Sequence, residues 1–140
     1  MQKAKLDRIL GHGCAGVIES AGAAGMTFKK GDHVLICGVS ACGTCSSCRK
    51  QMYSHSIHGG WILENPIDGT HDDFVRKPVA EMSPYHLPKG EDEDALVMQS
   101  DILPTGSECG VLHGKAAPGS SVAIFGAEPV GLVALLTARF

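Results

Sequence analysis

Three cysteines stand within seven residues of one another, in the stretch CGTCSSC: Cys42, Cys45 and Cys48. This cluster restricts the local fold strongly, because short C-x2-C turns bring successive thiolates toward a single ion. An iron–sulfur run of the C-x2-C-x2-C-x3-C type would need a further thiol at position 52, which is Met52. The spacing therefore predicts a compact metal-binding loop, with zinc favoured and free or oxidisable thiols as the alternative.

A closed tetrahedral zinc site needs one ligand more than these cysteines supply. The chain carries no further cysteine close to Cys48, and the residue eight positions after it is Ser56. We expect that ligand to come from His55 or His58, or from water. Six cysteines in a chain without a visible export signal indicate reduced thiols in the cytosol, so a disulfide framework is the less favoured alternative.

Charge and composition exclude several classes of partner. The net charge is −3 and the 12 basic residues are scattered, which gives no electrostatic footprint for nucleic acid or an anionic membrane. No stretch approaches the ~20 apolar residues that span a bilayer, and the N-terminus shows no apolar signal region. We therefore expect a cytoplasmic protein, whose 44% hydrophobic content suffices for a packed core.

The hydrophobic pattern changes character near residue 90. Residues 1–90 combine glycine-rich turns with short β-like runs such as AGVIES and DHVLIC, which favours an irregular, mostly antiparallel β domain. The acidic run 91–94 then precedes an apolar stretch, as acids at a helix N-terminus do. A second helical stretch is expected within 104–116.

The last part of the chain, PGSSVAIFGAEPVGLVALLTARF, predicts a strand followed by a helix. We expect a turn at Pro118 and Gly119, a buried strand over 121–126, and an apolar helix from about Pro129, a residue tolerated in the first helical turn. This order is the opening βα unit of a doubly wound sheet. One such unit cannot complete that sheet, which needs several parallel neighbours.

The turn GAEPVG between that strand and helix partly matches a phosphate-binding turn. Gly126 and Gly131 take the places of the first and third glycines of G-x-G-x-x-G, which serve the turn and the packing of helix on strand. Glu128 stands where the backbone should approach a pyrophosphate, and its charge opposes that anion. The turn therefore supports the strand–turn–helix order strongly, and it gives only weak support for dinucleotide binding.

Two isolated residues are weaker candidates for metal binding. His12 is flanked by glycines in LGHGCAG, yet a lone histidine is more often a hydrogen-bonded structural residue. Asp101 follows an apolar stretch in MQSDILPTG and is read most simply as a cap for the helix after it.

Taken in order, these segments resemble the zinc-dependent medium-chain alcohol dehydrogenases, and most of all their formaldehyde and secondary-alcohol branch. The matching stretches are ILGHGCAGVIES, KKGDHVLICGVSACGTCSSCRK, GGWILENPIDGTHDDFVRKP, ALVMQSDILPTGSECGVL and SSVAIFGAEPVGLVALLTA. The resemblance implies a mixed fold: a GroES-like, mainly-β catalytic domain over residues 1–103, lacking its N-terminal part, and the first βα unit of a truncated Rossmann NAD(P)-binding domain over 104–140.

The resemblance also assigns residues to two zinc sites. His12 matches the catalytic-zinc histidine and Asp101 the ligand at the domain junction. The three cysteines of the 42–48 loop match the first three ligands of the structural zinc, and the two glycines of the GAEPVG turn match the coenzyme turn.

Several departures from the family pattern accompany these matches. The glutamate that follows the family's histidine is Gly13, the fourth structural cysteine is Ser56, and the middle coenzyme glycine is Glu128. The family's first catalytic ligand, a cysteine upstream of the histidine, is not in this chain, and Cys14 is a weak substitute. Two inherited ligands predict an incomplete catalytic zinc site.

The resemblance implies NAD(P)-linked oxidation of an alcohol or formaldehyde adduct, with zinc as Lewis acid. The departures predict that the isolated chain lacks this activity unless a complementing chain or a homo-oligomer supplies the missing parts. One alternative is a small zinc-binding or scaffold module that depends on the 42–48 loop. Another is a non-functional remnant of a dehydrogenase gene, whose exposed apolar face over 121–140 predicts aggregation.

Overall fold

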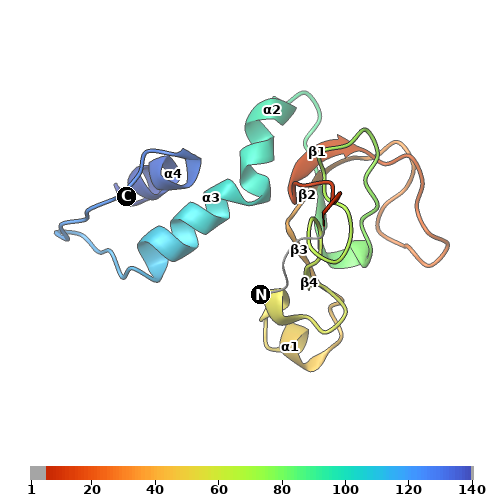
Figure 1. Ribbon diagram of the computed structural model, residues 1–140, viewed down its shortest axis with the longest axis horizontal. Helices are drawn as coiled ribbons and strands as arrows, with labels where there is room; N and C mark the ends of the chain where they lie inside the picture. The colour runs from red at the N-terminus through yellow and green to blue at the C-terminus, as the bar shows by residue number, and fades with distance from the viewer. Residues whose placement is uncertain (1–5, 140) are drawn as a thin grey trace. The chain divides into compact units, whose positions relative to one another are not determined.

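Short antiparallel strands form the framework of the first part of the chain in the computed structural model, which describes residues 6–139 (Figure 1). One sheet has the order β1-β2-β5, made of β1 (Cys14–Val17), β2 (His33–Ile36) and β5 (Pro84–His86). A second pairs β3 (Val39–Ser40) with β4 (Gly60–Trp61). The prediction of a mostly antiparallel β domain is confirmed. This part forms a compact unit that ends at Val97, and a second unit begins at Met98.

The central strand β2 carries the core of the larger sheet. Val34 pairs with Gly16 on one side and with His86 on the other. Val34 and Leu35 are both buried. Because successive strand residues point to opposite faces, their burial shows that both faces of β2 are covered.

A backbone ladder outside the two sheets fixes the segment before β1. The amide of Gly69 donates to Ile9 O at 2.8 Å, and the amide of Thr70 donates to Gly11 O at 2.9 Å. The two backbones approach so closely at Gly69 that a β-carbon there would collide with Gly11 O. These contacts set the position of His12, the next residue along the chain.

Short helical turns connect the strands of the first unit: α1 (Ser46–Arg49) and the 3-10 turns η1 (Tyr53–His55) and η2 (Ala80–Met82). Val79 precedes η2 with φ 54° and ψ 47°, which is the left-handed region of backbone conformation. For a β-branched residue this conformation is a genuine outlier, because its side chain crowds the backbone there.

The acidic run begins a helix as the sequence predicts. α2 (Glu93–Leu96) continues into the 3-10 turn η3 (Val97–Ser100). The carboxylate of Asp92 accepts hydrogen bonds from the amides of Asp94 at 3.1 Å and Ala95 at 3.3 Å. These bonds satisfy amides that have no partner inside the first turn.

Helices make up most of the second unit. α3 (Ile102–Thr105) continues into a π-helical segment, η4 (Gly106–Leu112), and α4 (Pro129–Thr137) lies alongside them (Figure 1). The contact is close, since a β-carbon at Gly110 would stand 2.7 Å from the Cβ of Ala134. The expected helix within 104–116 and the expected helix from about Pro129 are thus both present. Among the described residues, no helix has the length and apolar character needed to cross a bilayer.

The expected buried strand over 121–126 is wrong. These residues form no strand in the described part of the chain, and Phe125 is 97% exposed. A strand needs a neighbour to satisfy its backbone groups, and the described residues of this unit offer none. Of the predicted βα unit, the described residues thus form the helix, α4, and not the strand before it.

Candidate metal centres

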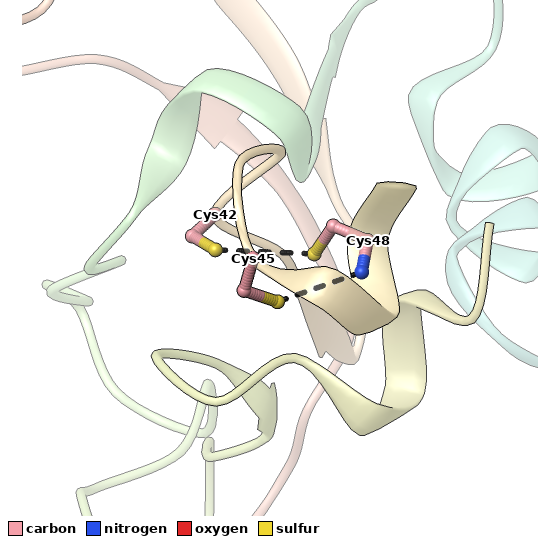
Figure 2. A group of neighbouring side chains, drawn as sticks. All are labelled: Cys42, Cys45 and Cys48. Carbon is pink, nitrogen blue, oxygen red and sulfur yellow. Dashed lines mark hydrogen bonds between the residues drawn. The ribbon is translucent and has the colours of Figure 1, made fainter. Parts of the chain in front are cut away.

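The three cysteines of the 42–48 loop converge as their spacing predicts. Their sulfur atoms all lie within 4.8 Å of one another, and the Sγ atoms of Cys42 and Cys48 are 3.9 Å apart. Figure 2 shows the three side chains gathered at the start of α1. Zinc–sulfur bonds of about 2.3 Å in a tetrahedron separate sulfur atoms by about 3.8 Å. The arrangement fits a metal ion held by three thiolates.

Local hydrogen bonds shape most of this loop, and two serines from farther along the chain add to them: the amides of Ala41 and Cys42 donate to the hydroxyls of Ser83 and Ser56. Cys45 is the N-cap residue of α1, and its Sγ accepts a hydrogen bond from the amide of Cys48 at 3.5 Å. Gly43 has φ 73°, which allows the sharp turn between the first two cysteines. Ala41, Cys45 and Cys48 are buried together in a small cluster. The sulfur atoms are therefore placed by the helix start and by their own packing.

Ser56 lies beside the cysteine cluster. It is buried, its Oγ accepts a hydrogen bond from the amide of Cys42 at 3.3 Å, and this Oγ is 4.0 Å from Cys45 Sγ. His55 and His58 are exposed, and neither joins the group of converging ligand atoms found among residues 6–139. The nearest side chain to a fourth corner is thus a serine hydroxyl.

The surroundings of the loop favour the thiolate form of two cysteines. The Ser56 hydroxyl, followed by the backbone amides of Thr44 and Cys45, lowers the pKa of Cys42 to about 5. The amide of Cys48 is the largest cause that lowers the pKa of Cys45. Because the thiolate is the metal-binding form of cysteine, the loop is prepared for a cation.

His12 has a carboxylate partner that the sequence did not suggest. Its Nδ1 lies 3.0 Å from Oε1 of Glu64, whose Oε2 accepts a hydrogen bond from the amide of Gly11 at 2.6 Å. The ring of Trp61 meets the imidazole edge-on, with ring centroids 5.6 Å apart. Glu64 is 52 residues from His12 in the chain, and no spacing rule connects the two.

Asp101 occupies the N-cap position of α3, as expected, but its side chain makes no capping hydrogen bond to the backbone of that helix. Its Oδ1 accepts a hydrogen bond from Thr105 Oγ1 at 2.9 Å, and its carbonyl accepts one from the Thr105 amide at 2.8 Å. Asp101 belongs to the second unit and His12 to the first. Their joint binding of a catalytic metal remains a prediction.

The GAEPVG turn has two glycines in restricted positions, and its charge opposes an anion. Gly126 has φ 103°, and a β-carbon at Gly131 would collide with Gly126 O, so both glycines are sterically required. Glu128 is the exposed N-cap residue of α4. Its carboxylate stands at the helix end where a pyrophosphate would bind. The residues present therefore do not fit a dinucleotide well.

Lys77 is a further polar residue that sequence reasoning missed. Its Nζ donates a hydrogen bond to the carbonyl of Cys37 at 2.7 Å. Burial lowers the pKa of Lys77 to about 8. Burial also raises the pKa of the Cys14 thiol, which makes Cys14 a poor metal ligand at neutral pH.

The sequence pattern of the alcohol dehydrogenase GroES-like domain matches residues 1–88. The chain belongs to this family. It is 32% identical over 137 residues to an NADP-dependent isopropanol dehydrogenase of Thermoanaerobacter brockii, covering 94% of this chain and 38% of that protein. It is 34% identical over 150 residues to a glutathione-independent formaldehyde dehydrogenase of Pseudomonas aeruginosa, covering 94% of this chain and 36% of that protein.

Solved structures give the same assignment. A zinc-dependent alcohol dehydrogenase 2 from Streptococcus pneumonia, in its apo form, superposes with a TM-score of 0.84 at 50% identity, covering 94% of this chain and 37% of that one. The chain thus spans well under half the length of the relatives it matches. The predicted resemblance to zinc-type alcohol and formaldehyde dehydrogenases is confirmed, and so is the GroES-like domain.

Proposed function

We propose that this chain binds one zinc ion through Cys42, Cys45 and Cys48, as the structural metal of a zinc-dependent alcohol dehydrogenase. The observation that carries the proposal is the convergence of the three sulfur atoms in a chain of this family. Zinc held there would tie the loop to the start of α1. In metal-dependent domains of this kind, metal binding contributes directly to folding.

The substrate class follows from the named relatives, which are dehydrogenases of isopropanol and formaldehyde. We propose a small alcohol or aldehyde as substrate of the complete NAD(P)-linked enzyme, which acts in the cytoplasm as a homo-oligomer or with a complementing chain. A catalytic zinc would supply Lewis acidity toward the substrate oxygen. In this chain His12 and Asp101 would hold that zinc, one ligand short of the usual three from the protein.

The 140 residues on their own should not catalyse hydride transfer. Two ligands hold a catalytic metal weakly, and Glu128 opposes the coenzyme. Steady-state NAD(P)H formation with short alcohols or formaldehyde, with zinc present, tests this statement. Zinc-dependent turnover by the isolated chain would overturn it.

Metal analysis of protein purified without added zinc tests the structural site. We expect about one zinc per chain in the wild type, as a single tetrahedral site holds one ion. Cys45→Ser should lose the metal, whereas Cys109→Ser should keep it because Cys109 is an exposed residue of the second unit. A wild type without metal, or a Cys45→Ser protein that retains it, would refute the proposal.

A second candidate function is a zinc-binding or scaffold module without enzymatic activity. It is favoured by the position of the loop, whose ligands and packing partners all lie in the first unit. The alternative of a non-functional remnant is favoured by the exposed apolar residues over 121–136, such as Phe125 and Leu132. Bound zinc in a soluble, cooperatively unfolding protein would support the module and contradict the remnant.

A further inference from the structure

The carboxylate of Glu64 makes two hydrogen bonds at the glycine–histidine pair. Oε2 accepts from the amide of Gly11 at 2.6 Å, and Oε1 lies 3.0 Å from Nδ1 of His12. The side chains of His12 and Glu64 are 32% and 20% exposed, so this contact is partly buried. An ionised carboxylate only accepts hydrogen bonds, so this contact favours a proton on Nδ1. In the neutral imidazole the lone pair then lies on Nε2.

Two further neighbours fix the plane of the imidazole ring. Trp61 meets it edge-on at an interplanar angle of 63°. On another side the backbone of Gly38 comes so close that a β-carbon there would stand 2.6 Å from Cδ2 of His12. The ring is thus held by a hydrogen bond, an aromatic contact and a close backbone approach, which together restrict its rotation.

Glu64 keeps this position in a strained backbone conformation. Its φ is 56°, in the left-handed region that residues other than glycine, asparagine and aspartate rarely adopt. Asn65, the next residue, is of a type that tolerates this region better. Strained residues persist where the surrounding structure holds them, often at functional sites. The strained residue Glu64 is thus the same residue that makes two hydrogen bonds to the segment carrying His12, which indicates that these bonds help to hold its conformation.

We propose that Glu64 is a positioning residue that holds His12 in the Nδ1-protonated tautomer and presents Nε2 as the atom that ligates a divalent metal. This inference rests on the proposed role of His12 as a zinc ligand. A histidine that donates its other ring N–H to a carboxylate is a more basic and better oriented ligand.

The tautomer can be read in the metal-free protein by long-range proton–nitrogen correlation NMR of the full chain, above pH 8 and with a reductant. We expect the His12 proton on Nδ1 in the wild type, with the resonance assigned by its loss in His12→Gln. In Glu64→Gln the amide can donate to Nδ1, so the proton should move to Nε2. Glu64→Gly serves as a second variant, because glycine accepts the backbone conformation if glutamine prevents folding.

A matched control exists within the same unit. Nδ1 of His33 lies 2.6 Å from Oε1 of Glu93, at an exposed position on the surface. Glu93→Gln should change the signals of His33 and leave those of His12 unchanged. A change at His12 in this control would mean that the tautomer responds to net charge, and would overturn the inference.

Zinc titration after the cysteine loop has been saturated completes the test. We expect zinc to shift the Nε2 resonance of His12 and to bind there about 10–100-fold more weakly in Glu64→Gln. Nε2-protonated His12 in the wild type, or the same tautomer in Glu64→Gln and Glu64→Gly, would overturn the positioning role. A tautomer change without any effect of zinc on His12 would support that role and refute the proposed catalytic metal.

Discussion

At the scale of single residues, Ser56 determines how tightly the cysteine loop can hold a metal. Its buried hydroxyl lies 4.0 Å from Cys45 Sγ and accepts a hydrogen bond from the Cys42 amide, so it is adjacent to the converging thiolates. A neutral hydroxyl is a much weaker zinc ligand than a thiolate. The three remaining thiolates leave a position that water can fill.

Ser56→Cys should therefore strengthen zinc binding by about tenfold or more, which corresponds to ~1.4 kcal/mol. Competition against a chromophoric chelator measures the affinity. Ser54→Cys is the matched control, because Ser54 is exposed and outside the cluster. Equal affinities of the two variants would show that position 56 does not face the metal.

Lys77 should make the stability of the first unit depend on pH. Its pKa is lowered from 10.5 to about 8 by burial, so between these values the unfolded chain binds more protons than the folded one. The free energy of unfolding therefore rises with pH across this window, by about 1–3 kcal/mol for a half-buried group. Below pH 8 the buried ammonium persists in the folded chain and this gain is absent.

Lys77→Met should remove the rise of the free energy of unfolding with pH. Urea unfolding midpoints at pH 7.5 and pH 9.5 measure this rise. Other groups titrate in both proteins, so the difference between them isolates Lys77. Lys89→Met, at an exposed lysine, should retain the wild-type dependence. A wild type and Lys77→Met with the same pH dependence would contradict the burial of this amine.

At the scale of elements, the sequence predicts what local chemistry determines. The cysteine loop, the acidic start of α2 and the proline at the start of α4 each depend on residues a few positions apart. The apolar run and flanking turns predict a strand over 121–126, yet a strand forms through pairing with another segment. The contact of Glu64 with His12 is equally non-local and has no signature in either segment.

The ladder between residues 9–11 and 69–71 should be the most sensitive backbone contact near His12. Gly69→Ala would push a β-carbon into Gly11 O, and we expect a loss of about 1–3 kcal/mol in the free energy of unfolding. Gly16→Ala is the control, since a β-carbon at Gly16 meets nothing within 4 Å. Chemical denaturation measures both, and equal stabilities would contradict the close approach.

At the scale of the whole molecule, the two units differ in how well they bury their apolar residues. The first has a sheet with a covered central strand, whereas the second exposes Phe125, Leu132, Leu135 and Leu136. Large exposed apolar surfaces indicate missing partners or a tendency to aggregate. The second unit should therefore limit the solubility of the isolated chain.

Phe125→Asp should reduce concentration-dependent self-association, because it places a charge at a residue that is 97% exposed. Sedimentation velocity at several concentrations measures the effect. Phe74→Asp is the comparison in the first unit, where Phe74 is 78% exposed. A larger effect of Phe74→Asp would show that self-association occurs through the first unit instead.

The left-handed conformation of Val79 has a consequence for the evolution of this chain. Relief of such strain by glycine is worth on the order of 1 kcal/mol, and every valine codon becomes a glycine codon through one change of its middle base. A single point mutation thus yields a chain without this strain, and we expect its product to resist heat better where the relief exceeds the entropy that glycine adds to the unfolded chain. Random mutagenesis followed by selection for thermal tolerance should recover Val79→Gly among its first isolates.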